Sequence, residues 1–389
     1  MSERIRVLVV DDSALMRKLI PQILSRDSEI EVVGTAMDGA FALKKIEELH
    51  PDVVTLDLEM PRMDGMQTLR LIMRNYPTPV ILFSTHSTEG AYSTFKALAL
   101  GALDFVAKPK DAAAGHLDAI AGQLIHKVKV AKRAGGRRLP NPEVPEAPQP
   151  RKKTGRPAVA PNRIVAIGIS TGGPNALQYV FSQIPAEFSA SIVVVQHMPE
   201  GFTDMFARRL DECSALDVHE AKSGDLLIAG RVLICPGNRH MMVRRMPRGE
   251  MVVLTDAPPI NGHRPSADVL FHSVAQEFGP RTVGILMTGM GEDGAEGLGA
   301  IRDAGGMTIA QSEETCVVGG MPRAAITKGY ATKILPLEGL GPFLVSQFGG
   351  DRSHERLEKP DKSDRNEEPE KRGRSAAAEK KEGVSSSRS

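Results

Sequence analysis

Residues 5–12, Ile-Arg-Val-Leu-Val-Val-Asp-Asp, decide the fold of the first part of the chain. The apolar run predicts a buried strand, and residues 14–24 after it repeat apolar side chains at helical spacing. Three similar strand-like runs follow at 52–57 (DVVTLD), 79–84 (PVILFS) and 104–108 (DFVAK). Short strands that alternate with helices predict a parallel sheet that helices cover on both faces.

Polar side chains stand where these strands end: Asp11, Asp12, Asp57, Ser84 and Lys108. The carboxyl ends of parallel strands share one edge of a sheet, so we expect these side chains to meet there. Clustered carboxylates repel one another unless a cation lies among them, and oxygen ligands with room for water suit Mg²⁺. The sequence therefore predicts a Mg²⁺ site formed by Asp11, Asp12 and Asp57. A lone aspartate at a strand end usually caps a turn, so this prediction rests on the joint pattern.

A carboxylate held beside Mg²⁺ can attack a phosphoryl donor. Here the sequence resembles the receiver domain of response regulators, over about residues 4–130. The resemblance implies a flavodoxin-like, doubly wound domain in which Asp57 is the phosphoacceptor. It also implies that Asp11 and Asp12 are the acidic pair that binds Mg²⁺.

The same resemblance gives roles to three further residues. Ser84 and Lys108 are expected to be the switch hydroxyl and the switch lysine, which hold the phosphoryl oxygens. Phe105, three residues before the lysine, matches the aromatic switch position of the family. Plain core packing would explain Phe105 as well.

The composition changes after the receiver-like residues 1–130. Residues 132–163 hold seven prolines, nine Lys or Arg and two Glu, so residues 131–162 are predicted to form a flexible linker. Its basic excess could contact an acidic partner, but a solvated spacer is the simpler interpretation. A second region of alternating strands and helices covers residues 163–348. The charged residues 349–389 hold too few apolar side chains to fold and are predicted to be disordered.

The composition of the whole chain excludes several classes of protein. Its 389 residues are enough for two domains, and its 41% hydrophobic content is ordinary for a soluble globular protein. The formal net charge of +1 gives no bias toward nucleic acid, and no apolar run is long enough for membrane insertion. The three cysteines lack the spacing of a zinc site or a disulfide framework. The sequence shows no signal peptide, so we expect a cytoplasmic protein.

The second region begins with a strand that runs into a serine. Residues 163–170, Arg-Ile-Val-Ala-Ile-Gly-Ile-Ser, precede a Gly-rich turn and a helical pattern. Gly168-Ile169-Ser170-Thr171-Gly172 thus fits the nucleophile motif G-x-S-x-G in its strand-to-helix context. The N–H groups at the start of the next helix could stabilise an oxyanion. A phosphate-binding turn or a simple tight turn would fit these residues as well.

His197 and Asp293 also follow strands of the second region. His197 ends the run SIVVVQH, and Asp293 lies in MTGMGEDG after the strand TVGILM. A serine hydroxyl needs a base beside it, and the base needs a carboxylate that fixes its tautomer. Strand-end placement therefore favours Ser170, His197 and Asp293 as a catalytic triad. His240 and His263 are rivals for the base.

This second region resembles the catalytic domain of the chemotaxis protein-glutamate methylesterases. The matching stretches are GISTGGP, QHMPEGFT, PGNRHM, HRPSADVLF, MTGMGEDG and CVVGGMPRAA. The resemblance implies a Rossmann-like, doubly wound α/β domain with Ser170 as nucleophile, His197 as base and Asp293 as orienting carboxylate. It also places the backbone N–H of Met290, with that of Thr171, in the oxyanion hole.

A receiver followed by this domain matches the whole layout of that family. The resemblance implies phosphorylation-activated hydrolysis of glutamate methyl esters on chemoreceptors, with release of methanol, and deamidation of receptor glutamines. It implies chemoreceptors and a chemotaxis histidine kinase as partners, Mg²⁺ for phosphorylation and no cofactor for hydrolysis. From the domain order and the linker, we expect the unphosphorylated receiver to cover the Ser170 cleft. Phosphorylation of Asp57 would then favour an open arrangement.

Two other classes of function compete with this interpretation. A DNA-binding response regulator would need a basic helix-turn-helix after the linker, whereas this chain continues with a strand and the serine motif. A hydrolase acting on receptors of another pathway, or an enzyme-shaped scaffold, fits the same residues. Methanol release from methylated receptor membranes, compared between the wild type and Ser170→Ala, separates an active esterase from a scaffold.

Overall fold

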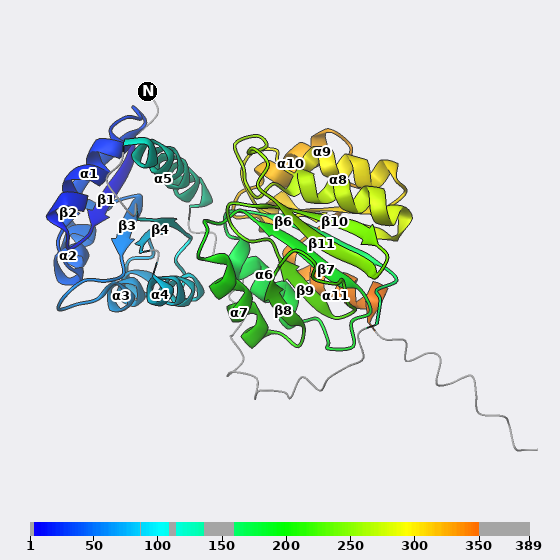
Figure 1. Cartoon of the computed structure of the whole chain (residues 1–389). Helices are drawn as coiled ribbons and strands as arrows, with labels where there is room; N and C mark the ends of the chain where they lie inside the picture. The colour runs from blue at the N-terminus through cyan, green and yellow to red at the C-terminus, as the bar shows by residue number, and fades with distance from the viewer. Residues whose placement is uncertain (1–3, 86, 109–113, 136–158, 350–389) are drawn as a thin grey trace, which may run out of the picture. The chain divides into compact units, whose positions relative to one another are not determined.

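The computed structural model describes residues 4–85, 87–108, 114–135 and 159–349 (Figure 1). They form two parallel sheets, each between layers of helices, and one antiparallel hairpin. Both sheets fall in one compact unit that ends at Gly350. Most of the predicted linker and nearly all of the predicted tail lie outside the described residues.

The first sheet has five strands in the order β2-β1-β3-β4-β5. All neighbouring strands are parallel, and this is the flavodoxin-like order expected from the sequence. Its strands are β1 (Ile5–Val10), β2 (Ile30–Ala36), β3 (Val53–Asp57), β4 (Val80–Ser84) and β5 (Asp104–Ala107). Its helices are α1 (Ala14–Leu24), α2 (Gly39–Leu49), α3 (Gly65–Asn75), α4 (Thr88–Ala99) and α5 (Ala114–Ala134).

Alternate residues of β1 point to opposite faces of this sheet. Val7 and Val9 pack with α1 and α5, while Leu8 and Val10 pack with α2, α3 and α4. All four side chains are at most 1% exposed. The strand is therefore buried on both sides, as its uninterrupted apolar run predicts.

The second sheet has seven parallel strands in the order β14-β13-β12-β6-β7-β9-β8. Its strands are β6 (Ile164–Ile169), β7 (Ser191–Gln196), β8 (Asp217–Glu220), β9 (Arg231–Ile234), β12 (Thr282–Leu286), β13 (Met307–Gln311) and β14 (Lys333–Leu335). Its helices are α6 (Gly173–Ser182), α7 (Thr203–Cys213), α8 (Ala267–Phe278), α9 (Ala295–Asp303), α10 (Gly320–Thr327) and α11 (Leu337–Phe348).

Helices cover both faces of the second sheet (Figure 1). Ile164 and Ala166 of β6 pack with α8, α9 and α10, while Val165 and Ile167 pack with α6, α7 and α11. Strand β6, at the centre of this sheet, is thus as buried as β1. Two parallel sheets covered on both faces confirm the predicted fold class.

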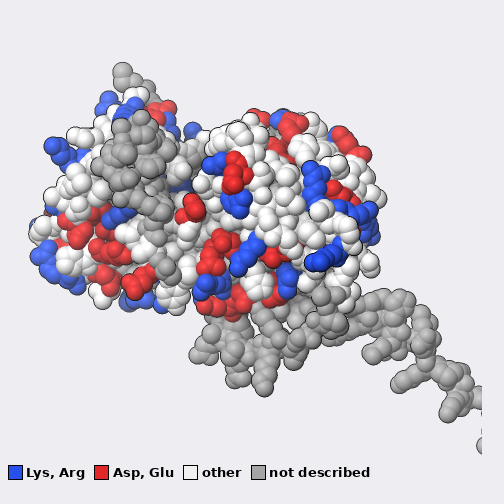
Figure 2. Space-filling model, in the orientation of Figure 1, with Lys and Arg blue, Asp and Glu red and all other residues white. Residues whose placement is uncertain are grey.

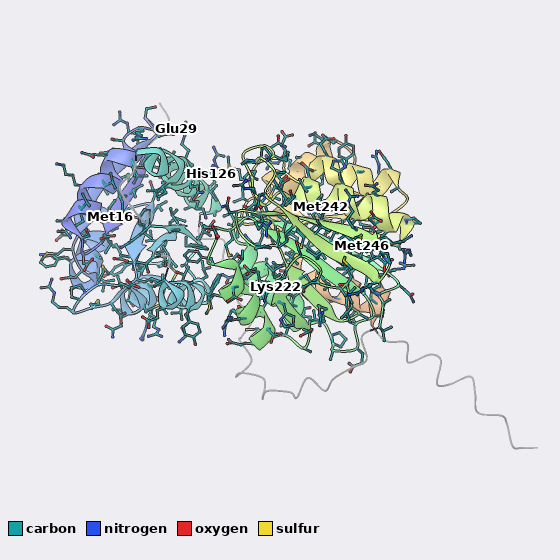
Figure 3. The ribbon with its side chains drawn as sticks, in the orientation of Figure 1. Met16, Glu29, His126, Lys222, Met242 and Met246 are labelled. Carbon is teal, nitrogen blue, oxygen red and sulfur yellow. The ribbon has the colours of Figure 1, made fainter. Side chains whose placement is uncertain are left out.

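A two-stranded hairpin of β10 (His240–Met246) and β11 (Gly249–Thr255) lies outside the parallel sheets. Met242 and Met246 lie on β10 (Figure 3), and Met246 at its end is 47% exposed. The Val243 N–H donates a 3.0 Å hydrogen bond to Ser273 Oγ on α8. The hairpin therefore helps to hold α8, whose first turn contributes to the site described below.

Acidic and basic side chains are interspersed on the face shown in Figure 2. This mixture agrees with the formal net charge of +1. Among the described helices, none combines the length and the apolar composition that a membrane span requires.

Candidate functional sites

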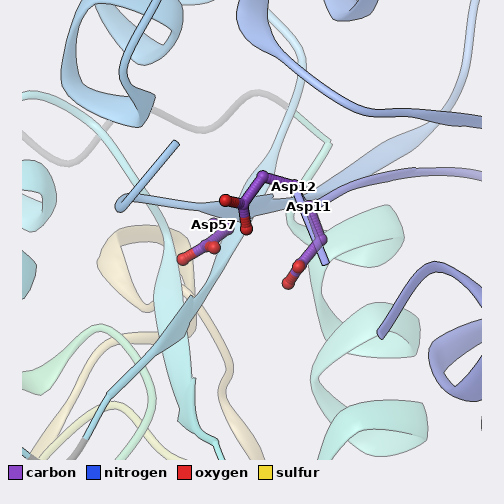
Figure 4. A group of neighbouring side chains, drawn as sticks. All are labelled: Asp11, Asp12 and Asp57. Carbon is purple, nitrogen blue, oxygen red and sulfur yellow. The ribbon is translucent and has the colours of Figure 1, made fainter. Parts of the chain in front are cut away.

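The side chains predicted to bind a metal ion meet at the carboxyl edge of the first sheet. Asp11 and Asp12 follow β1, Asp57 is the last residue of β3, and Lys108 follows β5. One carboxylate oxygen of each aspartate lies within 4.8 Å of those of the other two (Figure 4). Asp11 and Asp57 are almost fully buried. Three oxygen donors at this spacing are the kind of ligand set that Mg²⁺ binds.

Lys108 bridges the two buried carboxylates. Its Nζ lies 2.7 Å from Asp57 Oδ2 and 3.2 Å from Asp11 Oδ2. Burial raises the pKa of Asp57 to about 6; the Asp11 charge adds to this effect and Lys108 opposes it. Burial likewise raises the pKa of Asp11. Buried carboxylates that resist ionisation together favour a bound cation, so these residues fit a divalent ion.

Ser84 and Phe105 both contact helix α4. Ser84 Oγ accepts a 2.6 Å hydrogen bond from Thr94 Oγ1 and donates one of 3.2 Å to the Gly90 carbonyl. The hydroxyl predicted to hold a phosphoryl oxygen is thus bonded to α4 in this structure. The Phe105 ring, 4% exposed, packs edge-on against Phe95 with centroids 6.3 Å apart.

Ser170 stands in a sharp turn between β6 and α6. Gly172 has a φ of 77°, in the left-handed region that favours glycine, and Pro174 lies in the first turn of α6. The Ser170 N–H donates to the Thr288 carbonyl at 2.9 Å, and the Gly173 N–H donates to the Ser170 carbonyl at 2.8 Å. These bonds fix the turn on both sides of the serine.

His197 and Asp293 meet because β12, β6 and β7 are neighbours in the sheet. The His197 N–H donates to the Ile169 carbonyl at 3.0 Å, which places the histidine beside the Ser170 turn. Its Nε2 lies 2.7 Å from Asp293 Oδ2. Its Nδ1 is buried and has no hydrogen-bond partner among the described residues. One ring nitrogen is thus fixed on a carboxylate while the other can accept a proton.

Asp293 is 1% exposed and is held by the first turn of α8. Its Oδ1 accepts hydrogen bonds from Ser266 Oγ at 2.6 Å and from the Asp268 N–H at 3.3 Å. Its Oδ2 accepts one from the Ala267 N–H at 2.7 Å. Burial raises the pKa of Asp293, but His197, Ser266 and the helix N–H groups outweigh it and lower the pKa to about 2. The carboxyl is therefore ionised at neutral pH.

The two N–H groups predicted for an oxyanion hole have no acceptor among the described residues. In the described part of the chain, neither the Thr171 N–H nor the Met290 N–H donates a hydrogen bond. A Cβ placed on Gly289 would lie 2.8 Å from Ser170 Cβ, so the Met290 loop comes close to the serine. Unbonded N–H groups beside a serine can receive a developing negative charge.

Two side chains that fix this site were missed at the level of sequence. Ser266 caps α8, and a serine just before the helical pattern of HRPSADVLF was the available signal. Gln196 is 2% exposed, and its Nε2 donates to the carbonyls of Ser170 at 3.0 Å and His197 at 3.1 Å. It ties the serine turn to the histidine, but no sequence pattern distinguishes it.

The two rival histidines lie in different surroundings. His240 is fully buried, and its Nε2 lies 3.1 Å from the Pro258 carbonyl. His263 stacks on His197, with ring centroids 4.2 Å apart. The ring nitrogen that contacts Asp293 belongs to His197.

Comparison with known proteins accounts for both halves of the chain. The CheB methylesterase family matches residues 165–344, and the response regulator receiver domain family matches residues 7–118. A protein-glutamate methylesterase/protein-glutamine glutaminase of Koribacter versatilis is 59% identical over 90% of this chain and 97% of that protein. A protein of the same description from Symbiobacterium thermophilum is 48% identical over 89% of this chain and 97% of that protein.

Two solved structures from Thermotoga maritima each match one part of the chain. The CheB methylesterase catalytic domain is 40% identical and covers 49% of this chain and 100% of its own, with a TM-score of 0.47. The CheB response regulator domain is 44% identical and covers 34% of this chain and 98% of its own, with a TM-score of 0.32. The relatives from Koribacter and Symbiobacterium, with the two family matches, show that the chain belongs to the family of CheB protein-glutamate methylesterases, enzymes that join a response regulator receiver domain to a methylesterase domain.

Proposed function

We propose that this chain is a phosphorylation-activated methylesterase of chemotaxis. It would hydrolyse glutamate methyl esters on chemoreceptors and deamidate receptor glutamines, in the cytoplasm. The His197–Asp293 pair beside the Ser170 turn carries the proposal. The descriptions of the relatives as protein-glutamate methylesterases and protein-glutamine glutaminases support the choice of substrate. The catalytic domain would be residues 163–348 and the receiver residues 1–130.

In the first half-reaction, the Ser170 hydroxyl attacks the carbonyl carbon of the glutamyl methyl ester. His197 Nδ1 takes the hydroxyl proton. The Nε2–H keeps donating its hydrogen bond to the Asp293 carboxylate, whose charge stabilises the imidazolium. The imidazolium then gives its proton to the departing methoxide. Methanol leaves, and a glutamyl ester of Ser170 remains. The buried Nδ1, which has no partner in the described part of the chain, supports this assignment because a base needs a free lone pair.

In the second half-reaction, His197 removes a proton from water and the resulting hydroxide attacks the glutamyl–Ser170 ester. The bond to Ser170 Oγ breaks, and the proton on His197 passes to that oxygen. The products are receptor glutamate and the free serine, and no cofactor is consumed. A glutamine side chain would follow the same steps with ammonia as the leaving group.

The N–H groups of Thr171 and Met290 would hold the carbonyl oxygen as it becomes an oxyanion in each half-reaction. Neither N–H donates to another described residue, which supports this role. The first turn of α6 adds the positive end of a helix dipole beside Ser170. Losing one such donor typically lowers the rate by about 10²–10³.

Asp57 would be the phosphoacceptor of the receiver. Its carboxylate would attack the phosphorus of a donor, such as the phosphohistidine of a chemotaxis histidine kinase, and form an aspartyl phosphate. The bond between phosphorus and the donor would break, and the donor group would leave. Asp11, Asp12 and Asp57 would hold Mg²⁺, which offsets the negative charge of the phosphoryl group. Lys108, 2.7 Å from the Asp57 carboxylate, would pair with the phosphoryl oxygens. Ser84 would reach them only by turning away from α4.

Four phenylalanine rings connect the receiver to the catalytic domain. The Phe105 ring centroid lies 4.7 Å from that of Phe202, and Phe95 stacks on Phe206 at 5.5 Å. All four rings are at most 5% exposed. Phe202 directly precedes α7, in the loop that follows His197. A phosphorylation that moved Phe105 would loosen this contact and favour an open catalytic domain.

Methanol release from methylated chemoreceptor membranes tests the catalytic assignment. We expect the full chain, given Mg²⁺ and a small-molecule phosphodonor, to release methanol, and Ser170→Ala to release none above background. Ser182→Ala changes an exposed serine on α6 and should keep the wild-type rate. Equal release by the wild type and Ser170→Ala would refute the assignment.

A second comparison tests the proposed control by the receiver. The phosphodonor should raise the rate of the wild type but not that of Asp57→Ala. Isolated residues 163–348 should be faster than the unphosphorylated full chain. If the isolated domain is no faster, inhibition by the receiver is wrong.

A further inference from the structure

The imidazole of His263 lies face to face with that of His197. The two ring centroids are 4.2 Å apart, and the ring planes differ by 6°. Both ring nitrogens of His197 already have a role, because Nε2 contacts Asp293 and Nδ1 is the nitrogen left to accept a proton. His263 therefore covers one flat face of a ring whose two edges have other roles.

A tight turn presents His263 to this ring. Ile260 and His263 exchange both backbone hydrogen bonds, of 3.0 and 2.8 Å. Asn261 and Gly262 between them have φ values of 51° and 79°. Positive φ at both central residues is typical of a type I′ turn, for which Asn-Gly is a preferred pair. The backbone of His263 is thus closely constrained.

The residues that follow the turn fix it further. The Arg264 guanidinium donates to Asn238 Oδ1 at 2.6 and 3.1 Å and to two backbone carbonyls at 3.0 and 3.2 Å. Two residues later, Ser266 donates to Asp293. One short segment therefore contacts both the predicted base, His197, and the carboxylate that orients it.

The His263 ring is neutral at physiological pH. Burial lowers the pKa of His263 to about 4, with the charges of His197 and His126 acting in the same direction and Asp293 opposing them. A charged ring at this distance would repel the imidazolium form of His197. A neutral aromatic face instead attracts a cation, so the stack suits His197 both before and after it takes a proton.

We propose that His263 is a positioning residue that acts through His197. The χ2 torsion of histidine is broad, so one hydrogen bond to Asp293 fixes an edge of the His197 ring but not its plane. The stack with His263 fixes the plane and holds Nδ1 toward the Ser170 turn. The same face stabilises the imidazolium that forms when Ser170 loses its proton. This inference deepens the proposed function and rests on it.

The test compares variants at position 263 in the phosphorylated full chain. His263→Phe keeps an aromatic face, whereas His263→Ala removes it and His263→Leu replaces it with an aliphatic side chain. We expect the kcat of His263→Ala and His263→Leu to fall about 2- to 30-fold, the range for a cation on an aromatic face, with KM unchanged. The kcat of His263→Phe should stay close to that of the wild type, and it should decrease in the same way at low pH. His219→Ala, an exposed histidine on β8, is the matched control.

Proton NMR of the resting enzyme gives a readout that does not depend on activity. The proton between His197 Nε2 and Asp293 should resonate at low field in the wild type and in His263→Phe, with His197→Gln identifying the signal. It should broaden or shift in His263→Ala and His263→Leu. Wild-type rates and spectra in these two variants would overturn the proposal, and so would a His263→Phe as slow as they are. If Ser170→Ala released as much methanol as the wild type, the proposed function would fail, while the spectra would still test the stack.

Discussion

The hydroxyl of Ser266 donates a 2.6 Å hydrogen bond to Oδ1 of Asp293. The same hydroxyl accepts the Val269 N–H at 3.5 Å and so caps α8. The first two N–H groups of α8 also point at this carboxylate. The position of His197, which Asp293 holds, therefore depends on a helix that supplies no residue of the proposed triad.

Replacing Ser266 should weaken both the fold and the proposed reaction. Ser266→Ala removes a hydrogen bond to a buried charge, worth about 1.5–3 kcal/mol, and a helix cap worth about 1 kcal/mol. We expect the free energy of unfolding to fall by about 2.5–4 kcal/mol and kcat to fall roughly tenfold. Denaturant unfolding and methanol release measure the two effects. Ser266→Thr keeps the hydroxyl and should retain most of the stability and most of the rate. A Ser266→Ala variant with the stability and rate of the wild type would contradict this expectation.

The low pKa of Asp293 makes the stability of the fold depend on pH. A carboxyl whose pKa is about 2 when folded, against an ordinary 3.8, stabilises the folded state above pH 3.8. This stabilisation, about 2 kcal/mol, is lost as the pH falls through about 2. The difference in unfolding free energy between the wild type and Asp293→Asn should therefore shrink as the pH falls from about 5 to about 2. Asp303→Asn, at an exposed aspartate, is the control, and a difference that does not change with pH would count against this assignment.

Gly289 keeps the Met290 loop close to Ser170. A Cβ at this position would lie 2.8 Å from Ser170 Cβ and 2.2 Å from Met321 Sδ. We expect Gly289→Ala to displace the loop and lower kcat by about 10²–10³, the effect of losing one oxyanion donor. Gly122→Ala adds a methyl group where nothing lies within 4 Å and should leave methanol release unchanged. A wild-type rate in Gly289→Ala would remove Met290 from the proposed oxyanion hole.

The central strands could be predicted from sequence, but most edge strands could not. β1, β3, β6 and β7 are buried on both faces, so each reads as an uninterrupted apolar run. The edge strand β2 contains Glu31 and Gly34, and the edge strand β8 reads Asp-Val-His-Glu. Half-exposed strands of this kind resemble loops in sequence. The β10–β11 hairpin carries an Arg-Arg pair and could not be predicted for the same reason.

The residues at strand ends were also predictable, because parallel topology brings them to one edge. Lys108 meets Asp57 in this way, and His197 meets Asp293. Contacts made from loops were not predictable, because they depend on how the loop folds back on the sheet. His263 reaches His197 from a turn in the loop between β11 and α8, which follows no strand of the parallel sheets.

Mg²⁺ binding should depend on the ionisation of Asp57. A carboxyl whose pKa is raised from 3.8 to about 6 favours the folded state below pH 3.8, and this contribution is lost as the pH rises through about 6. The unfolding free energy of the metal-free chain should therefore include a contribution that falls as the pH rises from about 4 to about 6. Mg²⁺ should restore it, because the ion binds ionised carboxylates.

Thermal unfolding with and without MgCl₂ measures this linkage. The rise in the unfolding midpoint on adding Mg²⁺ should be small at about pH 5 and large at about pH 7.5, since one pH unit below its pKa only about a tenth of Asp57 is ionised. Asp57→Asn should lose most of this rise, and Asp303→Asn should keep it. The same rise at both pH values would show that Asp57 is not a ligand of the ion.

The contact between Phe105 and Phe202 should oppose activity before phosphorylation. Their ring centroids lie 4.7 Å apart, and an aromatic pair contributes about 0.5–1.5 kcal/mol beyond the area it buries. We expect Phe105→Ala and Phe202→Ala each to raise methanol release by the unphosphorylated chain and to reduce the fold activation by a phosphodonor. Phe105→Ala is the cleaner variant, because it leaves the catalytic domain unaltered.

A double-mutant cycle distinguishes this contact from a general loosening of the fold. Each single substitution already breaks the ring pair. The double variant should therefore raise methanol release by the unphosphorylated chain less than the sum of the two single effects predicts. Phe41→Ala, at an exposed ring on α2, should leave basal release unchanged. Additive effects would mean that the two rings act separately, and the receiver would then have to inhibit the catalytic domain through other contacts.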